Sequence, residues 1–507
     1  MLTTALSSNR PYFIDMLRKI RTRLALLMMI GITGLFLDFT GCLHTWLGWM
    51  AKIQFLPALL ALHVAVVVAL VALTLIFGRI YCSVICPLGI LQDGISWLSG
   101  RRKKKRFRFS YSPAKSWLRY VVLALFVVAL IAGIGSLVAL LAPYSAYGRM
   151  VHSLLMPLYV WANNLLAGWA ERAGSYAIYS REVWLRSLAT TLVAAGTLVT
   201  LFVLAWRHGR TYCNTICPVG TVLGFLSRFA WLKVHILEEK CVNCGLCARS
   251  CKASCIDAKN HRIDYSRCVA CGNCLEKCHT GALVYRHAAG ETLIPKSAEP
   301  SRRAFLVGAA LASTAAAMAQ RRKKVDGGLA LIEQKVAPER STPITPPGSL
   351  SAKHMAQHCT ACQLCVTACP NDVLRPSTDL MKLMQPTASY ERGYCRPECT
   401  RCSEVCPAGA IQPISRAEKS SIQIGHAVWI KANCIPLTDG VSCGNCARHC
   451  PAGAITMVPS DSANPDSPKI PAVDETRCIG CGACENLCPA RPFSAIYVEG
   501  HEVHRYI

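Results

Sequence analysis

Twenty-four cysteines of this chain form six groups whose spacing suits the ligands of iron–sulfur clusters. Four groups follow the spacing C-x2-C-x2-C-x3-C, and the other two lengthen only the first spacer, to three and eight residues. In such a run three closely spaced thiolates bind three iron corners of one cubane, while the fourth cysteine points toward a partner cluster. The groups are Cys241, Cys244, Cys247 and Cys251; Cys268, Cys271, Cys274 and Cys278; Cys359, Cys362, Cys365 and Cys369; Cys395, Cys399, Cys402 and Cys406; Cys434, Cys443, Cys446 and Cys450; and Cys478, Cys481, Cys484 and Cys488.

Zinc is the alternative occupant of closely spaced cysteines, but zinc sites combine pairs of ligands. Here triplets with a fourth cysteine recur six times, so the sequence predicts six [4Fe–4S] clusters in two ferredoxin-like modules. By the exchange rule, Cys278 completes the first cluster and Cys251 the second. The exchange among the four C-terminal groups stays open. Cys255 stands outside the pattern, and its interpretation as a small buried hydrophobe is favoured over that of a spare ligand.

A twelve-residue motif occurs twice, at 78–89 and 209–220, with eight identical positions. Each copy contains C-x3-C-P, and the two copies together supply four thiols, those of Cys82, Cys86, Cys213 and Cys217. These thiols could hold a seventh cluster or form a redox disulfide, or they could be small residues at crowded helix ends. Because both cysteines and the following proline are duplicated, the functional interpretation is favoured. The repeat also indicates a duplicated helix hairpin.

Long apolar segments occupy the first half of a chain that combines a net charge of +26 with a mean hydropathy of +0.31. Four of them, at 24–41, 55–78, 120–142 and 187–206, approach or exceed the ~20 residues with which a helix spans a bilayer. Lys and Arg cluster before the first, between the second and third, and after the fourth, which places both ends of this unit in the cytoplasm. This clustering argues against nucleic-acid binding. The stretch 153–170 is expected to lie in the interface on the opposite side.

The chain is therefore expected to have four parts. They are an α-helical membrane domain with four spans in two duplicated hairpins (1–236), a cytoplasmic two-cluster module (237–290), a connecting part (291–349) and a four-cluster module (350–507). Both cluster modules are expected to have α+β ferredoxin-like folds. The connecting part contains Ser-Arg-Arg-Ala-Phe-Leu from position 301, a short apolar run, and a linker rich in Pro, Ser and Thr.

Residues 18–290 resemble the NapH family of polytopic quinol dehydrogenase subunits in their four spans, two C-x3-C-P motifs and two ferredoxin runs. Residues 301–490 resemble NapG, an exported four-cluster ferredoxin in which Ser-Arg-Arg-x-Phe-Leu is a twin-arginine export signal. The resemblance implies a fusion of both subunits in the bacterial inner membrane, in contact with lipid and quinone. It further implies that quinol is the substrate, that 350–507 is periplasmic, and that a periplasmic reductase or cytochrome is the redox partner.

Quinol oxidation releases two protons, so a titratable group has to reach the quinol hydroxyls near the membrane interface. Ionisable residues in or beside a membrane span are candidates for such a role. Asp38 and His44, in the first outer loop, are the predicted catalytic pair. His63 inside the second span and His152 in the second outer loop are the alternatives.

A second function class is an assembly or maturation factor, which would reduce a metal or thiol during the biogenesis of a respiratory metalloenzyme. The four-cluster C-terminal module favours an electron relay instead, because a long series of clusters suits transfer between distant partners.

Overall fold

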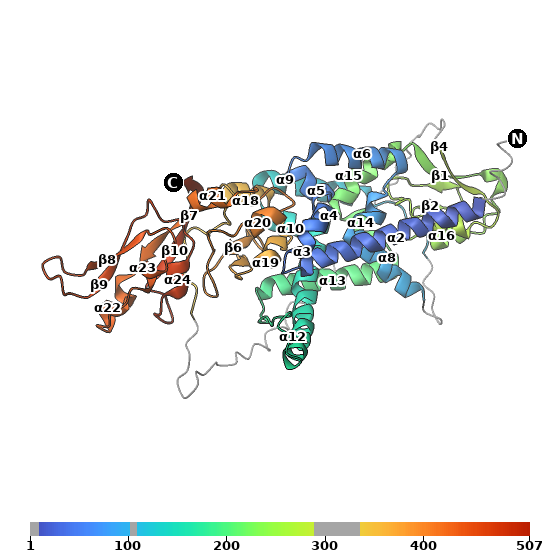
Figure 1. Ribbon diagram of the computed structural model, residues 1–507. Coiled ribbons are helices and arrows are strands. Elements are labelled where there is room, and N and C mark those ends of the chain that lie inside the picture. Colours follow the sequence, from blue (N-terminus) through green and yellow to red (C-terminus); the bar gives the residue numbers. More distant parts are fainter. Residues whose placement is uncertain (1–9, 102–108, 288–334) are drawn as a thin grey trace.

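The computed structural model describes residues 10–101, 109–287 and 335–507. Figure 1 shows three parts in a row, with a helical unit between a small cluster module that contains β1 and β4 and a larger C-terminal cluster module that contains β7 and β10. The predicted twin-arginine segment at 301–320 and most of the basic run at 101–106 lie outside the described residues.

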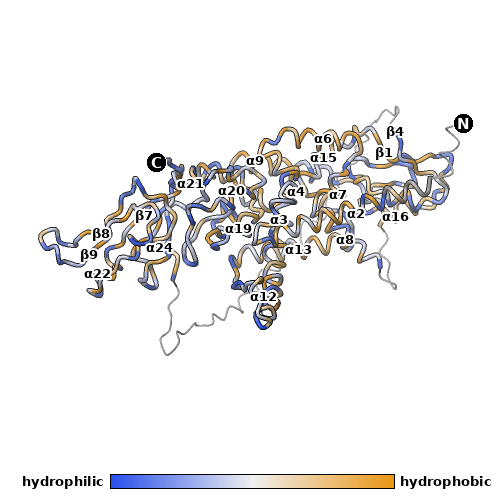
Figure 2. Tube along the Cα trace, in the orientation of Figure 1, coloured by the Kyte–Doolittle hydropathy of each residue, from blue (hydrophilic) through white to orange (hydrophobic). Residues whose placement is uncertain are grey.

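The helical unit begins with one long helix and continues as a series of shorter helices joined by tight turns. Figure 2 shows that hydrophobic residues run along these helices. Its elements are α2 (Arg10–Leu37), α3 (Cys42–Leu47), α4 (Trp49–Lys52), α5 (Phe55–Leu60), α6 (Val64–Phe77), α7 (Tyr81–Val84), α8 (Pro87–Gly100), α9 (Ser116–Ala132), α10 (Gly135–Leu141), α11 (Pro143–Met150), the π-helical turn η1 (Val151–Leu155), α12 (Met156–Arg172), α13 (Leu188–His208), α14 (Thr211–Thr215), α15 (Pro218–Leu226) and η2 (Ser227–Phe229).

Two of the four predicted spans are broken, so a domain of four continuous spanning helices is not confirmed. Among the described residues, only Arg18–Leu37 and Leu188–His208, of 20 and 21 residues, are long and apolar enough to cross a membrane, judged by length and composition. The predicted span 55–78 stops between α5 and α6, where Leu62 adopts a φ of 54°. The predicted span 120–142 stops after α9, where Gly133 has a φ of 72° and ends the helix in a left-handed conformation.

Both copies of the repeated motif have the same local secondary structure. In both copies an apolar helix ends at a glycine of positive φ, Gly78 (76°) or Gly209 (64°), and a helix of one turn follows. The second cysteine of each motif is then the N-cap of the next helix, α8 or α15, and the proline takes its first turn. Proline is favoured there because the first N–H groups of a helix have no partner within the helix.

The N-terminal cluster module is an α+β unit held by two small antiparallel sheets. The strand β1 (Leu232–Ile236) pairs with β4 (Leu283–His287), so the module begins five residues before the predicted boundary at 237. The remaining elements are η3 (Glu238–Lys240), α16 (Leu246–Ser250), β2 (Ile256–Asp257), β3 (Arg262–Ile263) and α17 (Asn273–Lys277).

The C-terminal cluster module is built on three antiparallel strand pairs, β5–β6, β7–β10 and β8–β9, with short helices between them. Its elements are α18 (Ala352–His358), α19 (Leu364–Ala368), β5 (Leu374–Pro376), β6 (Pro386–Ala388), α20 (Arg401–Val405), α21 (Arg416–Ser421), β7 (Ile422–Trp429), η4 (Lys431–Asn433), α22 (Ile435–Thr438), α23 (Asn445–Arg448), β8 (Ile455–Pro459), β9 (Lys469–Val473), α24 (Ala483–Leu487) and β10 (Ile496–Tyr506).

The end of the predicted linker packs onto this module and is not a free connection. Residues 344–349 are buried, and the Arg340 guanidinium donates two hydrogen bonds, of 2.6 and 2.8 Å, to the Glu485 carboxylate. Lys335 Nζ donates to the backbone carbonyls of Glu485, Asn486 and Cys488. The abundance of Pro, Ser and Thr predicted a linker. The same composition is also compatible with a packed segment, here called the strap, that has no regular secondary structure.

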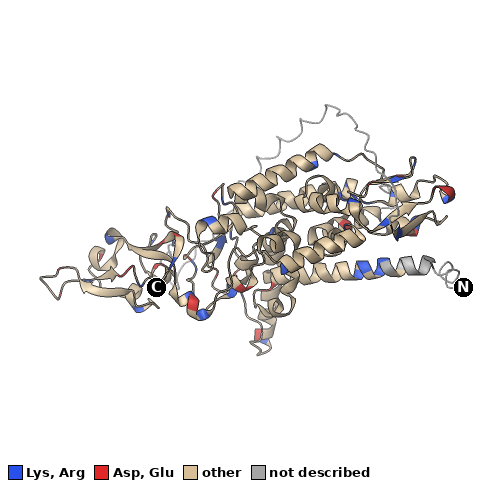
Figure 3. Cartoon of the chain, turned by 90° about the horizontal axis from the view of Figure 1, so that it is seen from above, with Lys and Arg blue, Asp and Glu red and all other residues tan. Residues whose placement is uncertain are grey.

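The two cluster modules contact opposite ends of the helical unit. At one end, the buried Arg79 and Arg119 both donate to Ser266 of the N-terminal module. At the other end, His152 is hydrogen-bonded to Thr367 of the C-terminal module, and Arg186 donates a hydrogen bond to Asp372 of the same module. Figure 3 shows Lys and Arg gathered on α2 toward its N-terminal end, beside the N-terminal module.

Candidate metal centres

Three cavities in the C-terminal module are each lined by four cysteines. In each cavity three cysteines come from one sequence group, and the fourth comes from the neighbouring group. The three sets are Cys359, Cys362 and Cys365 with Cys406; Cys395, Cys399 and Cys402 with Cys369; and Cys434, Cys443 and Cys446 with Cys488. The exchange that the sequence left open therefore occurs between neighbouring groups.

The remaining C-terminal thiols complete the same pattern. Burial raises the pKa of Cys484 far above its usual range, and the adjacent Cys481, Cys478 and Cys450 add to this rise. Cys450 thus faces the fourth group, as Cys488 faces the third. Thiols crowded in this way are held as neutral groups unless a positive metal centre stabilises their thiolates.

Short helices direct the fourth cysteines away from their own groups. Each of α16, α17, α19, α20 and α24 has five residues, and its C-cap is the fourth cysteine of the group. At Cys369 and Cys406 the backbone turns to extended values, with ψ of 112° at both residues. The third cysteine stays within the helix, so the two thiols point into different cavities.

The N-terminal module has a comparable cavity lined by five thiols. Cys268, Cys271 and Cys274 line it together with Cys251, as the exchange rule predicted, and with Cys255. Cys255 is buried, as expected, and its Sγ lies 3.5 Å from that of Cys251.

The other group of this module is less enclosed. The pKa of Cys247 is raised by burial and by the adjacent Cys241 and Cys244, which places these three thiols together. The fourth predicted ligand, Cys278, ends α17 with its Sγ 3.6 Å from Thr280 Oγ1.

The duplicated motifs meet inside the helical unit and bring their four cysteines together. Cys82, Cys86, Cys213 and Cys217 are all buried, and each of Cys86 and Cys217 lies within electrostatic reach of thiols from the other copy. The thiols of the second copy receive hydrogen bonds, from Gln92 Nε2 to Cys213 Sγ at 3.1 Å and from the Gly220 N–H to Cys217 Sγ at 3.3 Å.

Two fully buried arginines brace this four-thiol site across the repeat. Arg79 Nη2 donates to the Cys213 carbonyl (3.3 Å), and Arg210 Nη1 donates to the Cys82 carbonyl (2.6 Å). The glycine of each C-P-x-G sequence also has the same surroundings in both copies. A Cβ at Gly89 would lie 2.3 Å from the carbonyl oxygen of Cys82, and a Cβ at Gly220 would lie 2.3 Å from that of Cys213. The repeated Gly-Arg and C-P-x-G residues therefore shape one site with approximate twofold symmetry.

A buried cation of the helical unit, Arg149, lies near Cys362, one of the four cysteines of the cavity that Cys406 closes. Arg149 is only 1% exposed, and its three guanidinium nitrogens have no hydrogen-bond partner among the described residues. It lies close to Cys362 and to Tyr212, which precedes Cys213 of the four-thiol site. Unpaired buried charge is costly, so an anionic group is expected at this place, and an iron–sulfur cluster with four thiolate ligands fits that requirement.

A second buried cation adjoins the next cavity. Lys419 is 5% exposed, lines the cavity of Cys369, Cys395, Cys399 and Cys402, and donates to the carbonyls of Arg396 and Cys399. Arg149 and Lys419 could not be identified from the sequence, because neither belongs to a motif. Arg79 and Arg210 could have been, since they occupy the same position in the two copies of the repeat.

No three His, Cys, Asp or Glu side chains converge on the position of a single metal ion within residues 10–101, 109–287 and 335–507. The thiols are instead distributed around cavities, as the ligands of a polynuclear cluster are.

The predicted quinol pair, Asp38 and His44, lies together but performs a structural task. The two side chains are 3.2 Å apart. However, the Asp38 carboxylate also accepts hydrogen bonds from the backbone N–H groups of Thr40, Gly41, Leu43 and His44, and so holds the start of α3. Its oxygens are thereby largely occupied.

The two alternative histidines differ from their predicted settings. His63 does not lie inside a continuous span, because it is exposed at the break between α5 and α6. His152 does not lie in an outer loop: it belongs to η1, is 6% exposed and is covered by the C-terminal module.

Comparison with known proteins identifies the family. Residues 59–106 and 190–236 match a family described as "4Fe-4S binding domain", and residues 264–373 and 441–491 match two described as "4Fe-4S dicluster domain". The methylamine utilization ferredoxin-type protein MauM of Methylobacillus flagellatus is 32% identical over 166 residues, which cover 32% of this chain and 70% of MauM. The ferredoxin-type protein NapF of Escherichia coli is 30% identical over 162 residues, which cover 32% of this chain and 89% of NapF. The chain belongs to the ferredoxin-type 4Fe–4S proteins.

This ferredoxin-type protein also resembles MauN, the methylamine utilization ferredoxin-type protein of Paracoccus denitrificans, with 26% identity over 224 residues, or 44% of the chain and 63% of MauN. No solved structure matches it. Its 4Fe–4S binding domains make it an iron–sulfur electron-transfer protein. The first family match includes both duplicated motifs, and so the four-thiol site.

Proposed function

We propose that this protein is a membrane-bound quinol dehydrogenase component, which takes electrons from quinol and passes them through iron–sulfur clusters to a periplasmic reductase or cytochrome. The observation that carries this proposal is the arrangement of thiol sites along the molecule. Cysteine-lined cavities lie at both ends of an apolar helical unit, and a four-thiol site lies between them. When bound, the clusters supply one-electron transfer steps.

The surface of the helical unit supports a place in the bacterial inner membrane. Large apolar side chains are exposed on its longest helices, and a soluble protein rarely exposes so many of them side by side. They include Leu26, Leu27 and Ile30 on α2; Val64 and Val68 on α6; Leu125, Val128 and Ile131 on α9; and Leu188, Val199 and Val203 on α13.

The docking of the two modules supports the fused NapH/NapG-like organisation that the sequence suggested. His287 is the last residue of the β1–β4 sheet, at one end of the helical unit. Lys335 is the first residue of the strap 335–349, which packs on the C-terminal module at the other end. Residues 287 and 335 therefore lie at opposite ends of that unit. With basic residues of α2 beside the N-terminal module, the positive-inside rule places 237–290 in the cytoplasm and 350–507 in the periplasm.

An anaerobically purified preparation is expected to contain about 24 iron atoms per chain from the six ferredoxin groups, or about 28 with a cluster at the four-thiol site, at four irons each. Metal analysis measures this number. Addition of a reduced quinol in lipid nanodiscs should then bleach the cluster absorbance. Zinc as the main metal would contradict the cluster assignment, and a protein that dithionite reduces but quinol does not would contradict the quinol assignment.

Arg149→Met is expected to lower the midpoint potential of a single cluster, because the guanidinium stabilises the added negative charge. A unit charge about 7 Å away is worth roughly 2.4 kcal/mol at an effective dielectric constant of about 20, or roughly 100 mV for a one-electron couple. A redox titration followed by EPR measures the shift. Lys419→Met is the matched variant, and should move a different signal. Unchanged potentials in Arg149→Met would show that no cluster lies beside Cys362.

A further inference from the structure

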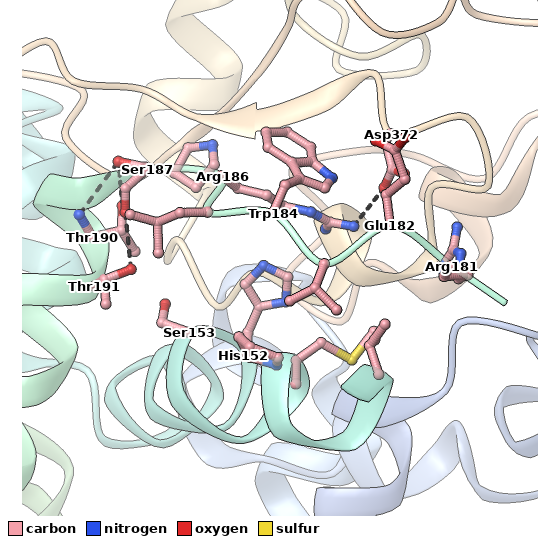
Figure 4. Close-up of a pocket in the computed structure, with 16 residues that line it drawn as sticks. His152, Ser153, Arg181, Glu182, Trp184, Arg186, Ser187, Thr190, Thr191 and Asp372 are labelled. Carbon is pink, nitrogen blue, oxygen red and sulfur yellow. Dashed lines mark hydrogen bonds and ion pairs between the residues drawn. The ribbon is translucent and has the colours of Figure 1, made fainter. Parts of the chain in front are cut away.

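An open cavity lies where the helical unit meets the C-terminal module. Its empty space amounts to about 600 Å³, a figure that includes the part open to solvent. His152 and Met156 form its floor, the segment 181–187 its roof, and Thr191 of α13 one wall. Figure 4 shows the His152 ring pointing from η1 toward the segment that carries Trp184 and Arg186.

His152 presents one ring nitrogen to this cavity. Its Nδ1 lies 2.8 Å from Thr367 Oγ1, which leaves Nε2 as the nitrogen available to a ligand. The ring belongs to a π-helical turn, a rare conformation that often occurs at functional sites. The ring is buried and therefore neutral, so its Nε2 can accept a hydrogen bond from a ligand hydroxyl.

Thr367, which is hydrogen-bonded to His152, lies between two predicted cluster ligands in the sequence. Thr367 lies in α19, two residues after Cys365 and two before Cys369. Cys365 faces the cavity closed by Cys406, whereas Cys369 faces the cavity of Cys395, Cys399 and Cys402. A two-electron donor bound against His152 would therefore adjoin two separate one-electron acceptors.

The cavity is also placed for a lipid-soluble ligand. Thr190 and Thr191 belong to the first turn of α13, one of the two helices long and apolar enough to span a membrane among the described residues. The neighbouring α12 exposes Leu158, Trp161 and Leu165. A Trp with an apolar stripe is typical of a helix at the membrane interface.

We propose that this cavity is the quinol site and that His152 is its proton acceptor; the inference rests on the proposed function. Both quinol O–H bonds break and the ring is oxidised to quinone. One proton passes to His152 Nε2, and the other to water at the exposed mouth beside Glu182. Iron–sulfur clusters held by Cys359, Cys362, Cys365 and Cys406 and by Cys369, Cys395, Cys399 and Cys402 would, when bound, each accept one of the two electrons.

The test uses the full, iron-loaded chain in nanodiscs and two independent measurements. An azidoquinone photolabel, mapped by mass spectrometry, reports binding, and anaerobic mixing with reduced quinol reports the rate of cluster reduction. In the wild type we expect label within 149–191. His152→Gln should reduce the rate by roughly 100-fold while label is retained, and Thr191→Trp, which fills the cavity, should abolish both. His208→Gln, at the far end of α13, is the matched control.

Iron content and reduction by dithionite confirm that each variant is folded and loaded. Wild-type rates in both pocket variants, or label outside the cavity, would overturn this site but leave quinol oxidation intact. If quinol fails to reduce the wild type while dithionite succeeds, the proposed function is overturned. The photolabel then decides separately whether the cavity binds a quinone.

Discussion

Replacing Cys406 by alanine should remove the cluster held by Cys359, Cys362 and Cys365, although Cys406 belongs to the next cysteine group in sequence. The cavity of these three cysteines is closed by Cys406 and not by Cys369. A cubane that loses one of its four thiolates is expected to be lost or degraded. Metal analysis should therefore show about four fewer iron atoms per chain.

Alkylation identifies which cluster is missing. In Cys406→Ala, iodoacetamide followed by peptide mass spectrometry should modify Cys359, Cys362 and Cys365, because their thiols lose their iron. Cys369→Ala is the matched variant, and should instead expose Cys395, Cys399 and Cys402. The opposite pattern, with Cys406→Ala exposing Cys395, would mean that the groups do not exchange their fourth ligands.

Arg340→Ala should destabilise the C-terminal module by about 3–5 kcal/mol, the usual cost of leaving a buried charge without its partner. Glu485 is 1% exposed, and its carboxylate accepts two hydrogen bonds from Arg340 and one from the Val498 N–H. Removal of the guanidinium leaves this carboxylate inside the module. The loss can be measured by denaturant unfolding, followed by the cluster absorbance.

Two control variants distinguish the effect of burying the ion pair from the effect of its charge. The ion pair of Arg392 with Glu182 has a similar length, 2.8 Å, but its side chains are 39% and 66% exposed. Arg392→Ala should therefore cost less than about 1 kcal/mol. In the double variant Arg340→Ala/Glu485→Gln, part of the lost stability should return. Equal losses in Arg340→Ala and Arg392→Ala would contradict the view that the strap at 335–349 is a structural part of the module.

The cluster cysteines could be identified from sequence because their spacing is a local property of the chain. Which group completes a cavity could not, because the fourth thiol depends on how the strand pairs β5–β6 and β8–β9 bring neighbouring groups together. The breaks at Leu62 and Gly133 were also missed: hydropathy averages over about 19 residues and does not register one residue of positive φ.

The quinol prediction shows a different limit. Asp38 and His44 are six positions apart in the sequence and lie close together, but the backbone N–H groups that occupy Asp38 became evident only with the fold. His152 was assigned to an exposed loop because the sequence does not reveal that a module some 200 residues later covers it. Contacts between distant parts of the chain decided both cases.

The placement of the cluster modules at opposite ends of the helical unit has an energetic consequence if that unit spans the membrane as proposed. An electron carried from one end to the other moves a full charge through the membrane potential, which is worth about 2.3 kcal/mol per 100 mV. In a cell that is negative inside, transfer toward the cytoplasmic module is opposed by this amount. Quinol oxidised at the outer end, beside Thr367, would deliver its electrons and protons on the same side, so turnover toward a periplasmic acceptor would be electroneutral.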